Sequence, residues 1–445
     1  MSSSDLFAIG SAGLKGFRAQ MGAVADNIAN ANSEGYNRRS VTLQESSMSA
    51  VAEPLYIPRA AFGGSEIVGV SRSNDIYLDA TARQTGQAFS NASTRLRWLS
   101  DIETALGDDA LGVGGSLSTM YGTIDKLAAS PTDTALRTNM IYGVEQVVTA
   151  FHNSSDALNS VLTGTFTTGQ GEATLINDSL DELARVNAAL LRSRKGTSNY
   201  AQLLDSRDTE LAKITQKLNV NVTFDTNDGA IVTYDGQALV QGDQTKTVSI
   251  QQNADATLRL MIDGAEYAVP TNGSLGGLFT SASMARQRLD SLDTLAVQFA
   301  TDMNTWHAGG LTDAGAAGGA VVSVGTTAAS LAKVISATSE IAAATADGRP
   351  NGNLLNISAT RGTGSVEQGW TALIAGHASV LNTTKAEAEA AEIRDVNARA
   401  AQQQVSGVDL DREAADLLRI QQAYQAAAKV IQAARETIDT ILNIS

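Results

Sequence analysis

The chain has 445 residues, a formal net charge of −15 and no cysteine. Its length exceeds what one hydrophobic core supports and favours roughly two to four structural units. The acidic balance argues against binding of nucleic acid, and the lack of cysteine excludes disulfides, thiol catalysis and thiolate metal sites. Residues 1–45 are neutral and residues 405–445 carry −2, so the remaining −13 falls on the middle. Nearly neutral ends can pack against copies of themselves, whereas an acidic middle suits exposure to water.

The first residues, Met1 to Gln20, have no uninterrupted apolar core behind a basic start, so we expect no cleavable signal peptide. No stretch approaches about 20 apolar residues, so we expect no insertion into a membrane. These signs alone favour a cytoplasmic location, which the motifs described below change to an extracellular one.

Residues 5–31 are predicted to form a helix with apolar residues at seven-residue spacing. Its first row is Phe7, Leu14, Met21 and Ile28, and its second row is Gly10, Phe17, Val24 and Ala31. Its glycines weaken the helix by about 1 kcal/mol each relative to alanine, but they permit close approach of another helix. A nucleotide-binding glycine loop is not expected, because no strand precedes these glycines.

The next segments alternate between extended and helical patterns. Residues 40–83 have the pattern of short strands and loops, overlapping a helix predicted over residues 76–106. Ser130 and Pro131 are expected to start a helix that continues to about Leu158. Residues 172–218 are predicted to be helical again, with a break at Gly196.

Residues 220–275 change to the period-two alternation of β-strands, with Asp-Gly pairs at the turns. Helix is expected to resume at about Ser281, followed by a glycine-rich loop over 309–319 and an irregular stretch over 320–360. Residues 370–404 return to a helical pattern. We therefore expect a small β-domain inserted into a mainly helical body.

Residues 405–445 are predicted to form a long helix with the same heptad pattern as the N-terminal helix. Its first row is Leu410, Leu417, Tyr424, Ile431 and Ile438; its second row is Ile420, Ala427, Ala434 and Ile441, with Glu413 as the one charged member. Burial of one large residue of such a row is worth roughly 1.5–3 kcal/mol, so this helix needs a partner. The matching heptads predict that the two chain ends pair with each other.

No motif in the sequence indicates catalysis, a cofactor or a metal. His152, His307 and His377 lie in separate segments without the spacing of metal ligands. Nucleophile-elbow, Walker A and calcium-loop patterns are not found either. We interpret His307 as a contact at a helix end, and we do not expect an enzyme.

Both chain ends carry motifs that resemble the flagellar axial proteins of bacteria, which are the rod, hook and hook-associated proteins. The N-terminal motif consists of Asn27, Ile28, Ala29, Asn30, Asn32, Gly35, Tyr36 and Arg38. The C-terminal motif, residues 406–432 with Gly407, Asp409 and Gln422, closely resembles the end of the hook-associated FlgK family. Residues 203–208 also resemble an internal FlgK motif that rod and short hook proteins lack. From composition alone, residues 27–39 would be interpreted as a polar segment that ends the N-terminal helix.

The resemblance implies a structural subunit at the junction between hook and filament, assembled as a ring of about eleven copies. It implies export through the flagellar type III apparatus and an extracellular location. The implied partners are the hook protein, hook-associated protein 3, the filament end, and an export chaperone on the C-terminal helix.

The predicted fold is mainly α with an inserted β-domain, and it is discontinuous along the chain. Residues 1–45 with 400–445 would form a coiled-coil base, residues 46–219 with 278–399 an α-rich middle domain, and residues 220–277 an outer β-domain. The assembly seam would be the two heptad rows of each end.

Two alternatives remain open at this point. The nearest is a flagellar hook or other axial protein, although a hook protein has a β-rich middle and this middle is dominated by helices. The second, from a different class, is a type III translocator or helical adhesin, but the long apolar hairpin that translocators need is not found.

Overall fold

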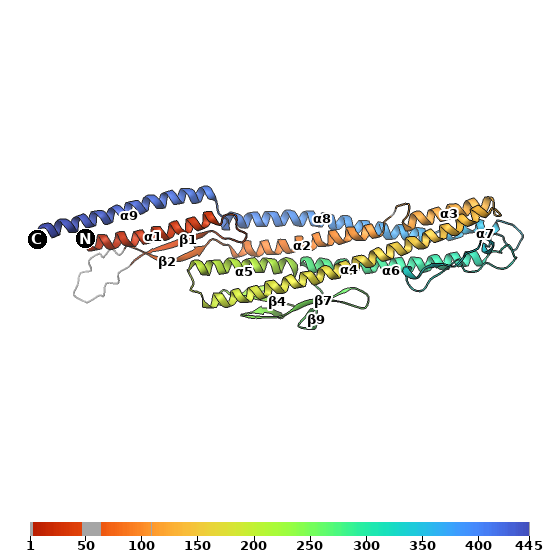
Figure 1. The fold of residues 1–445 in the computed structure, drawn as a ribbon, viewed down its shortest axis with the longest axis horizontal. Coiled ribbons are helices and arrows are strands. Elements are labelled where there is room, and N and C mark those ends of the chain that lie inside the picture. Colours follow the sequence, from red (N-terminus) through yellow and green to blue (C-terminus); the bar gives the residue numbers. More distant parts are fainter. Residues whose placement is uncertain (1–2, 47–63, 108, 445) are drawn as a thin grey trace.

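The computed structural model describes residues 3–46, 64–107 and 109–444. Figure 1 shows a long rod of helices with small sheets along one side, and both chain ends lie at the same end of the rod. The helices are α1 (Ser3–Ala29), α2 (Ile76–Ala105), α3 (Val113–Ala129), α4 (Thr134–Arg192), α5 (Ser198–Lys217), α6 (Gly273–Ala308), α7 (Gly352–Leu355), α8 (Val366–Ser406) and α9 (Leu410–Ile444). The prediction of a mainly helical fold with a small β portion is confirmed.

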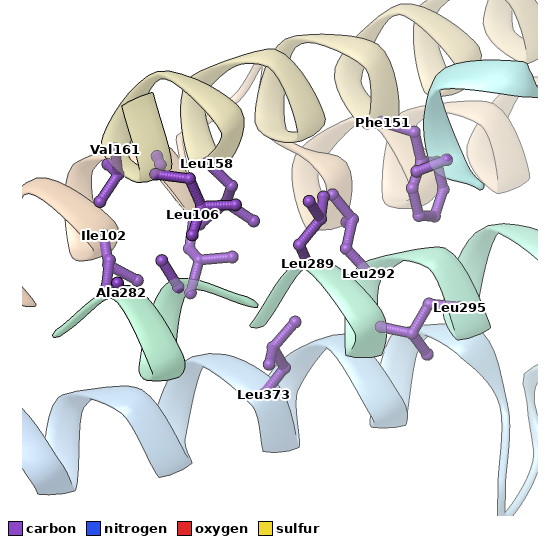
Figure 2. Close-up of a cluster of buried hydrophobic side chains, with 14 of the residues drawn as sticks. Ile102, Leu106, Phe151, Leu158, Val161, Ala282, Leu289, Leu292, Leu295 and Leu373 are labelled. Carbon is purple, nitrogen blue, oxygen red and sulfur yellow. The ribbon is translucent and has the colours of Figure 1, made fainter. Parts of the chain in front are cut away.

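Helices α2, α4, α5, α6 and α8 pack along one another and form the body of the rod. Their facing sides bury a continuous apolar core, in which Figure 2 shows Leu158 of α4, Leu289 of α6 and Leu373 of α8. Each such leucine contributes roughly 1.5–3 kcal/mol through removal from water. The body is therefore held together by side chains from segments that are far apart in the sequence.

The predicted helix start at Ser130 and Pro131 is wrong. Ser130 ends α3, a helix that the sequence did not predict, and α4 begins at Thr134. The Asp133 carboxylate accepts hydrogen bonds from the backbone N–H groups of Ala135 and Leu136, and so caps α4. Asp133 is a stronger cap than Ser130 because its negative carboxylate also interacts favourably with the positive N-terminal end of the helix dipole.

Helix α4 also continues well past the expected end near Leu158. It runs for 59 residues to Arg192 because apolar side chains such as Val161 and Ile176 keep occurring on its buried face. The predicted break at Gly196 is confirmed, since this glycine has a φ of +81° and lies between α4 and α5.

Helix α6 begins at Gly273 and not near Ser281 as expected. The Asn272 side chain caps its N-terminus, and Leu275 and Leu278 extend its buried face into the core. The stretch that follows α6 is irregular as predicted, with the two-residue strands β10 (Val322–Ser323) and β11 (Ala332–Lys333) and the short α7 near the far end of the rod.

The β-strand pattern of residues 220–275 is confirmed. The strands are β3 (Asn221–Phe224), β4 (Ala230–Tyr234), β5 (Gln237–Gln241), β6 (Gln244–Thr245), β7 (Val248–Gln252), β8 (Leu258–Ile262) and β9 (Ala265–Tyr267). They form two antiparallel sheets, β3 to β6 and β7 to β9. The predicted turn at Asp235 and Gly236 has positive φ at both residues, as does the turn at Asp263 and Gly264.

Both sheets lie against α4, and asparagine side chains of that helix bind their strands. The Asn187 amide donates to the carbonyl of Ala230 and accepts from its N–H, and the Asn177 amide does the same with Val248. These paired bonds satisfy buried backbone groups at the start of β4 and β7. The remaining strands, β1 (Arg39–Glu45) and β2 (Ser65–Arg72), form a hairpin beside α1.

We expect Leu158→Ala to lower the free energy of unfolding by about 2–5 kcal/mol, because Leu158 is fully buried in the core. The matched control is Leu191→Ala in the same helix, where 67% of the side chain is exposed and the loss should be about 0.5 kcal/mol or less. Urea unfolding followed by circular dichroism measures both values. Equal losses for the two variants would contradict the core described above.

Candidate functional site

The two chain ends pair as antiparallel helices, α1 against α9. Asn27 near the end of α1 contacts Glu413 near the start of α9, and Gly10 near the other end lies against Ile431. A Cβ atom at Gly10 would lie 2.6 Å from Ile431 Cγ1, so a side chain at this position would push the helices apart. The predicted pairing of the ends and the close approach at a glycine are therefore confirmed.

The contact between the helices uses mainly the second predicted row of each helix, joined by Ile431 from the first row of α9, which lies on Gly10. Val24 of α1 and Ile420 of α9 are 6% and 5% exposed, and Ala434 and Glu413 are buried. Phe17, another member of the second row of α1, is half-buried.

The first row of each helix remains partly open to solvent. Phe7 is 49% exposed and Leu410 is 50% exposed, while the other members are half-buried or, for Ile28, just exposed. We call this set the apolar stripe; it consists of Phe7, Leu14, Met21 and Ile28 of α1 and Leu410, Leu417, Tyr424, Ile431 and Ile438 of α9. Ile441 continues the second row of α9, and its side chain lies outside the described part of the structure.

The β1–β2 hairpin covers a different side of α1, where Gly16 contacts Leu43 and Gly64 contacts Ala12. On each helix the first row lies three residues before the second row, so it is rotated from the contact by a similar angle in the same sense. Because the two helices run antiparallel, these equal rotations bring both first rows to the same side of the pair, away from the hairpin. The partly exposed members of the apolar stripe therefore lie along one side of the helical pair and come from both chain ends.

A cluster of polar side chains closes the inner end of the helical pair, and Asn27 lies at its centre. The Asn27 amide donates 2.9 Å bonds to Glu413 Oε2 and to the Arg39 carbonyl, and its oxygen accepts from the Arg39 N–H and the Tyr36 hydroxyl. Arg38 Nε lies 2.6 Å from Glu413 Oε1. Burial raises the pKa of the Tyr36 hydroxyl to about 12, so it remains a hydrogen-bond donor. We call Asn27, Arg38, Arg39, Asp205 and Glu413 the polar junction.

The other family-motif residues shape the backbone on either side of this junction. Gly35 has a φ of +75° and abuts Thr209, and Asn30 donates to the Asp26 carbonyl. Asp409 accepts from the N–H groups of Asp411 and Arg412 and so caps α9, just after Gly407. Asn32 and Gln422 lie on the surface.

The internal motif of residues 203–208 also reaches the polar junction, which the sequence did not indicate. Asp205 of α5 accepts hydrogen bonds from Asn37, Arg39 and Arg72. Arg72 also pairs with Asp208. Burial lowers the pKa of the Arg72 guanidinium, but the carboxylates of Asp208 and Asp205 outweigh this effect and raise it overall. Three stretches that are distant in the sequence thus meet at one place.

Residues 99–321, half of the chain, match the family model of the flagellar hook-associated protein FlgK helical domain. The chain belongs to the FlgK family. The matched range includes the β insertion and the Asp205 motif. Residues 402–444 match the model of the flagellar basal body rod FlgEFG protein C-terminal region, which covers α9.

Two relatives carry the name flagellar hook-associated protein 1. The one from Bacillus subtilis is 22% identical over 490 aligned residues, which cover 96% of this chain and 95% of the relative. The one from Salmonella typhimurium is 26% identical over 313 residues, which cover 67% of this chain and 55% of the relative. The chain thus spans nearly the whole of the first relative and about half the length of the second.

A solved structure, the flagellar hook junction protein FlgK from Burkholderia pseudomallei, matches with a TM-score of 0.49 and 22% identity. The match covers 56% of this chain and 46% of that one. FlgK family members are structural proteins of the flagellum.

The three histidines bind backbone groups in three separate places. His152 and His377 each bind one carbonyl oxygen, of Leu331 and Leu99 respectively. His307 lies at the end of α6 with 1% of its surface exposed, as the predicted helix-end contact requires.

Within the described residues no group of three or more His, Asp or Glu side chains could hold a metal ion, and no helix could cross a membrane.

We expect Glu413→Gln to weaken the polar junction by about 1.5–3 kcal/mol, because it replaces charge-assisted hydrogen bonds from Arg38 and Asn27. Hydrogen exchange of the first turn of α9 in the full chain should become faster. The control is Glu436→Gln, which removes an exposed carboxylate from the same helix. Equal exchange in the two variants would show that Glu413 carries no special contact.

We expect the free energy of unfolding to fall as the pH drops below the ordinary histidine pKa of 6.5, in part because of His307. Burial lowers the pKa of His307, whose Nδ1–H donates to the Gly319 carbonyl while Nε2 accepts from the Ala342 N–H. The folded state therefore needs the neutral ring. The contribution of His307 to the free energy of unfolding is complete above pH 6.5 and is lost as the pH falls below this value. Urea unfolding across this range should give a shallower loss for His307→Gln than for the parent; parallel curves would contradict the assignment.

Proposed function

We propose that this protein is a structural subunit of the junction between the flagellar hook and filament, and that it assembles through its terminal helices. Membership of the FlgK family supports a place in the flagellum. The observation that carries the mode of assembly is the apolar stripe, because a partly exposed row on both helices of a pair is suited to further helices.

Assembly would bury the apolar stripe between neighbouring copies. Each large residue removed from water contributes roughly 1.5–3 kcal/mol, so a few such contacts outweigh the free energy lost when subunits associate. A closed ring of about eleven copies is the geometry that we propose, with the hook protein on one side and hook-associated protein 3 and the filament on the other. Nearly neutral ends would not repel one another in such a ring.

We further propose export of the chain through the flagellar type III apparatus to the cell exterior. A chaperone on α9 would cover its apolar rows before export, when α1 is not yet paired with it. In the assembled protein, residues 1–45 with 400–445 would be the assembly domain, residues 46–219 with 278–399 the α-rich domain, and residues 220–277 a β-domain without catalytic function.

Deletion of the gene tests this function directly. We expect complete hooks without filaments, and flagellin released into the medium. Filaments of normal length would contradict the proposal. Missing hooks would favour the alternative of a hook or other axial protein, and normal filaments with reduced binding to host cells would favour a translocator or adhesin.

We expect Leu417→Asp and Ile431→Asp to prevent filament attachment while the body of the rod stays folded. Leu417→Asp puts a charge into the apolar stripe, and Ile431→Asp also puts one against Gly10 of α1. Phe7→Asp should act in the same way with little effect on the helical pair, since half of the Phe7 side chain is already exposed. The control is Gln425→Asp on the exposed side of α9. Swimming and filament number measure the result, and normal swimming of all three stripe variants would count against the stripe.

A further inference from the structure

The terminal helices are joined to the body in two places. One is the short connection from α8 to α9, and the other is the β1–β2 hairpin with the loop that precedes it. Helix α1 packs on this hairpin through Gly16 and Leu43, and the hairpin in turn lies on α5 and the turn before it. One contact is a backbone bond, in which the Val70 N–H donates to the Gly196 carbonyl at 2.7 Å. The direction of the terminal helical pair therefore depends on the α8–α9 connection and on how the hairpin lies on α5.

The open end of the hairpin carries two arginines directly opposite each other. Arg39 of β1 and Arg72 of β2 are cross-strand partners in the ladder. Like charges in this arrangement destabilise a hairpin, and burial of the two side chains, which are 9% and 4% exposed, increases the penalty. A negative group from outside the hairpin is needed between them.

Asp205 of α5 supplies this negative group. Its Oδ2 lies 3.0 Å from an Arg39 guanidinium nitrogen and its Oδ1 lies 3.0 Å from one of Arg72, while Asn37 donates a 2.7 Å bond to Oδ1. The carboxylate is 10% exposed, so water screens these contacts weakly. One side chain of the body thus holds both strands and the preceding loop.

The two arginines do not depend on Asp205 equally. Arg72 has a second carboxylate, Asp208, whereas Asp205 is the acidic partner of Arg39. Arg39 also stacks on the Tyr36 ring at 4.7 Å, and its Nε atom is buried without a hydrogen-bond partner. Loss of the Asp205 charge would leave the Arg39 guanidinium buried without a counter-charge. Movement of the hairpin away from α5 would return this guanidinium to water and so remove the penalty.

We propose that Asp205 is the positioning residue that fixes the hairpin on α5 and so sets, together with the α8–α9 connection, the direction in which the terminal helices leave the body. The bond from Val70 to Gly196 and the ion pair of Arg72 with Asp208 remain when Asp205 is neutralised, and both hold β2, so the Arg39 strand is the part of the hairpin that is released. The importance of this direction for ring assembly rests on the proposed function, but the attachment itself does not.

The experiment uses the full-length protein and distances between two spin labels. The chain has no cysteine, so Gln44→Cys on β1 and Glu389→Cys on α8, both exposed, accept labels without background. We expect one narrow distance distribution in the parent and a broad or shifted one in Asp205→Asn. Hydrogen exchange of the β1 amides should become about 100-fold faster in this variant.

Glu210→Gln is the matched control, because Glu210 lies on the same helix and its ion pair is with Lys213 of that helix. It should leave both measurements unchanged. In a double-mutant cycle, Arg39→Gln should cost less in the Asp205→Asn background than in the parent, because the like-charge pair is then already uncompensated. A narrow, unshifted distribution in Asp205→Asn would overturn the proposal, whether or not the gene deletion supports a junction function.

Discussion

The buried contact between Asn27 and Glu413 is the interaction on which the arrangement of the chain ends depends. It joins residues 386 positions apart and lies inside an otherwise apolar seam. Apolar side chains alone would allow α1 and α9 to slide by a turn, because leucine, isoleucine and alanine tolerate several registers. A carboxylate that must meet Asn27 and Arg38 allows one register only, since any other would bury it without a partner. The seam therefore supplies stability and the polar junction supplies specificity.

The same division of roles occurs where the sheets meet the body. Apolar residues of the strands join the helical core, whereas the amides of Asn177 and Asn187 fix where the sheets lie along α4. In both places a side-chain amide binds a backbone N–H and a carbonyl of one residue, which is a contact with a single acceptable geometry. Long helices with repetitive surfaces need such fixed points, because their packing alone specifies position along the axis poorly.

The sequence predicted the elements whose local signals agree with their packing. Heptads of apolar residues indicated the terminal helices, and Asp-Gly pairs indicated the turns of the β insertion, since both signals act over a few residues. Helix α3 was missed, and the start of α4 was placed too early, because Ser130 and Asp133 are both good capping residues and the Ser-Pro pair was preferred to Asp133. The sequence predicted the heptad rows, but it did not predict which row of each helix faces the other terminal helix. The role of Asp205 had no local signal at all, because its partners lie more than 130 residues away.

The length of the body gives the attachment at α5 a mechanical consequence. Helix α4 has 59 residues, and at 1.5 Å per residue it is about 90 Å long, so the body acts as a lever arm. A rotation of only about 5° at its base would move the tip of such an arm by about 8 Å, nearly the separation of two packed helices. In the ring that we propose, subunits would tolerate little of this error before their outer parts collide or separate. Angular precision at one carboxylate would thus decide whether the outer surface of the ring is continuous.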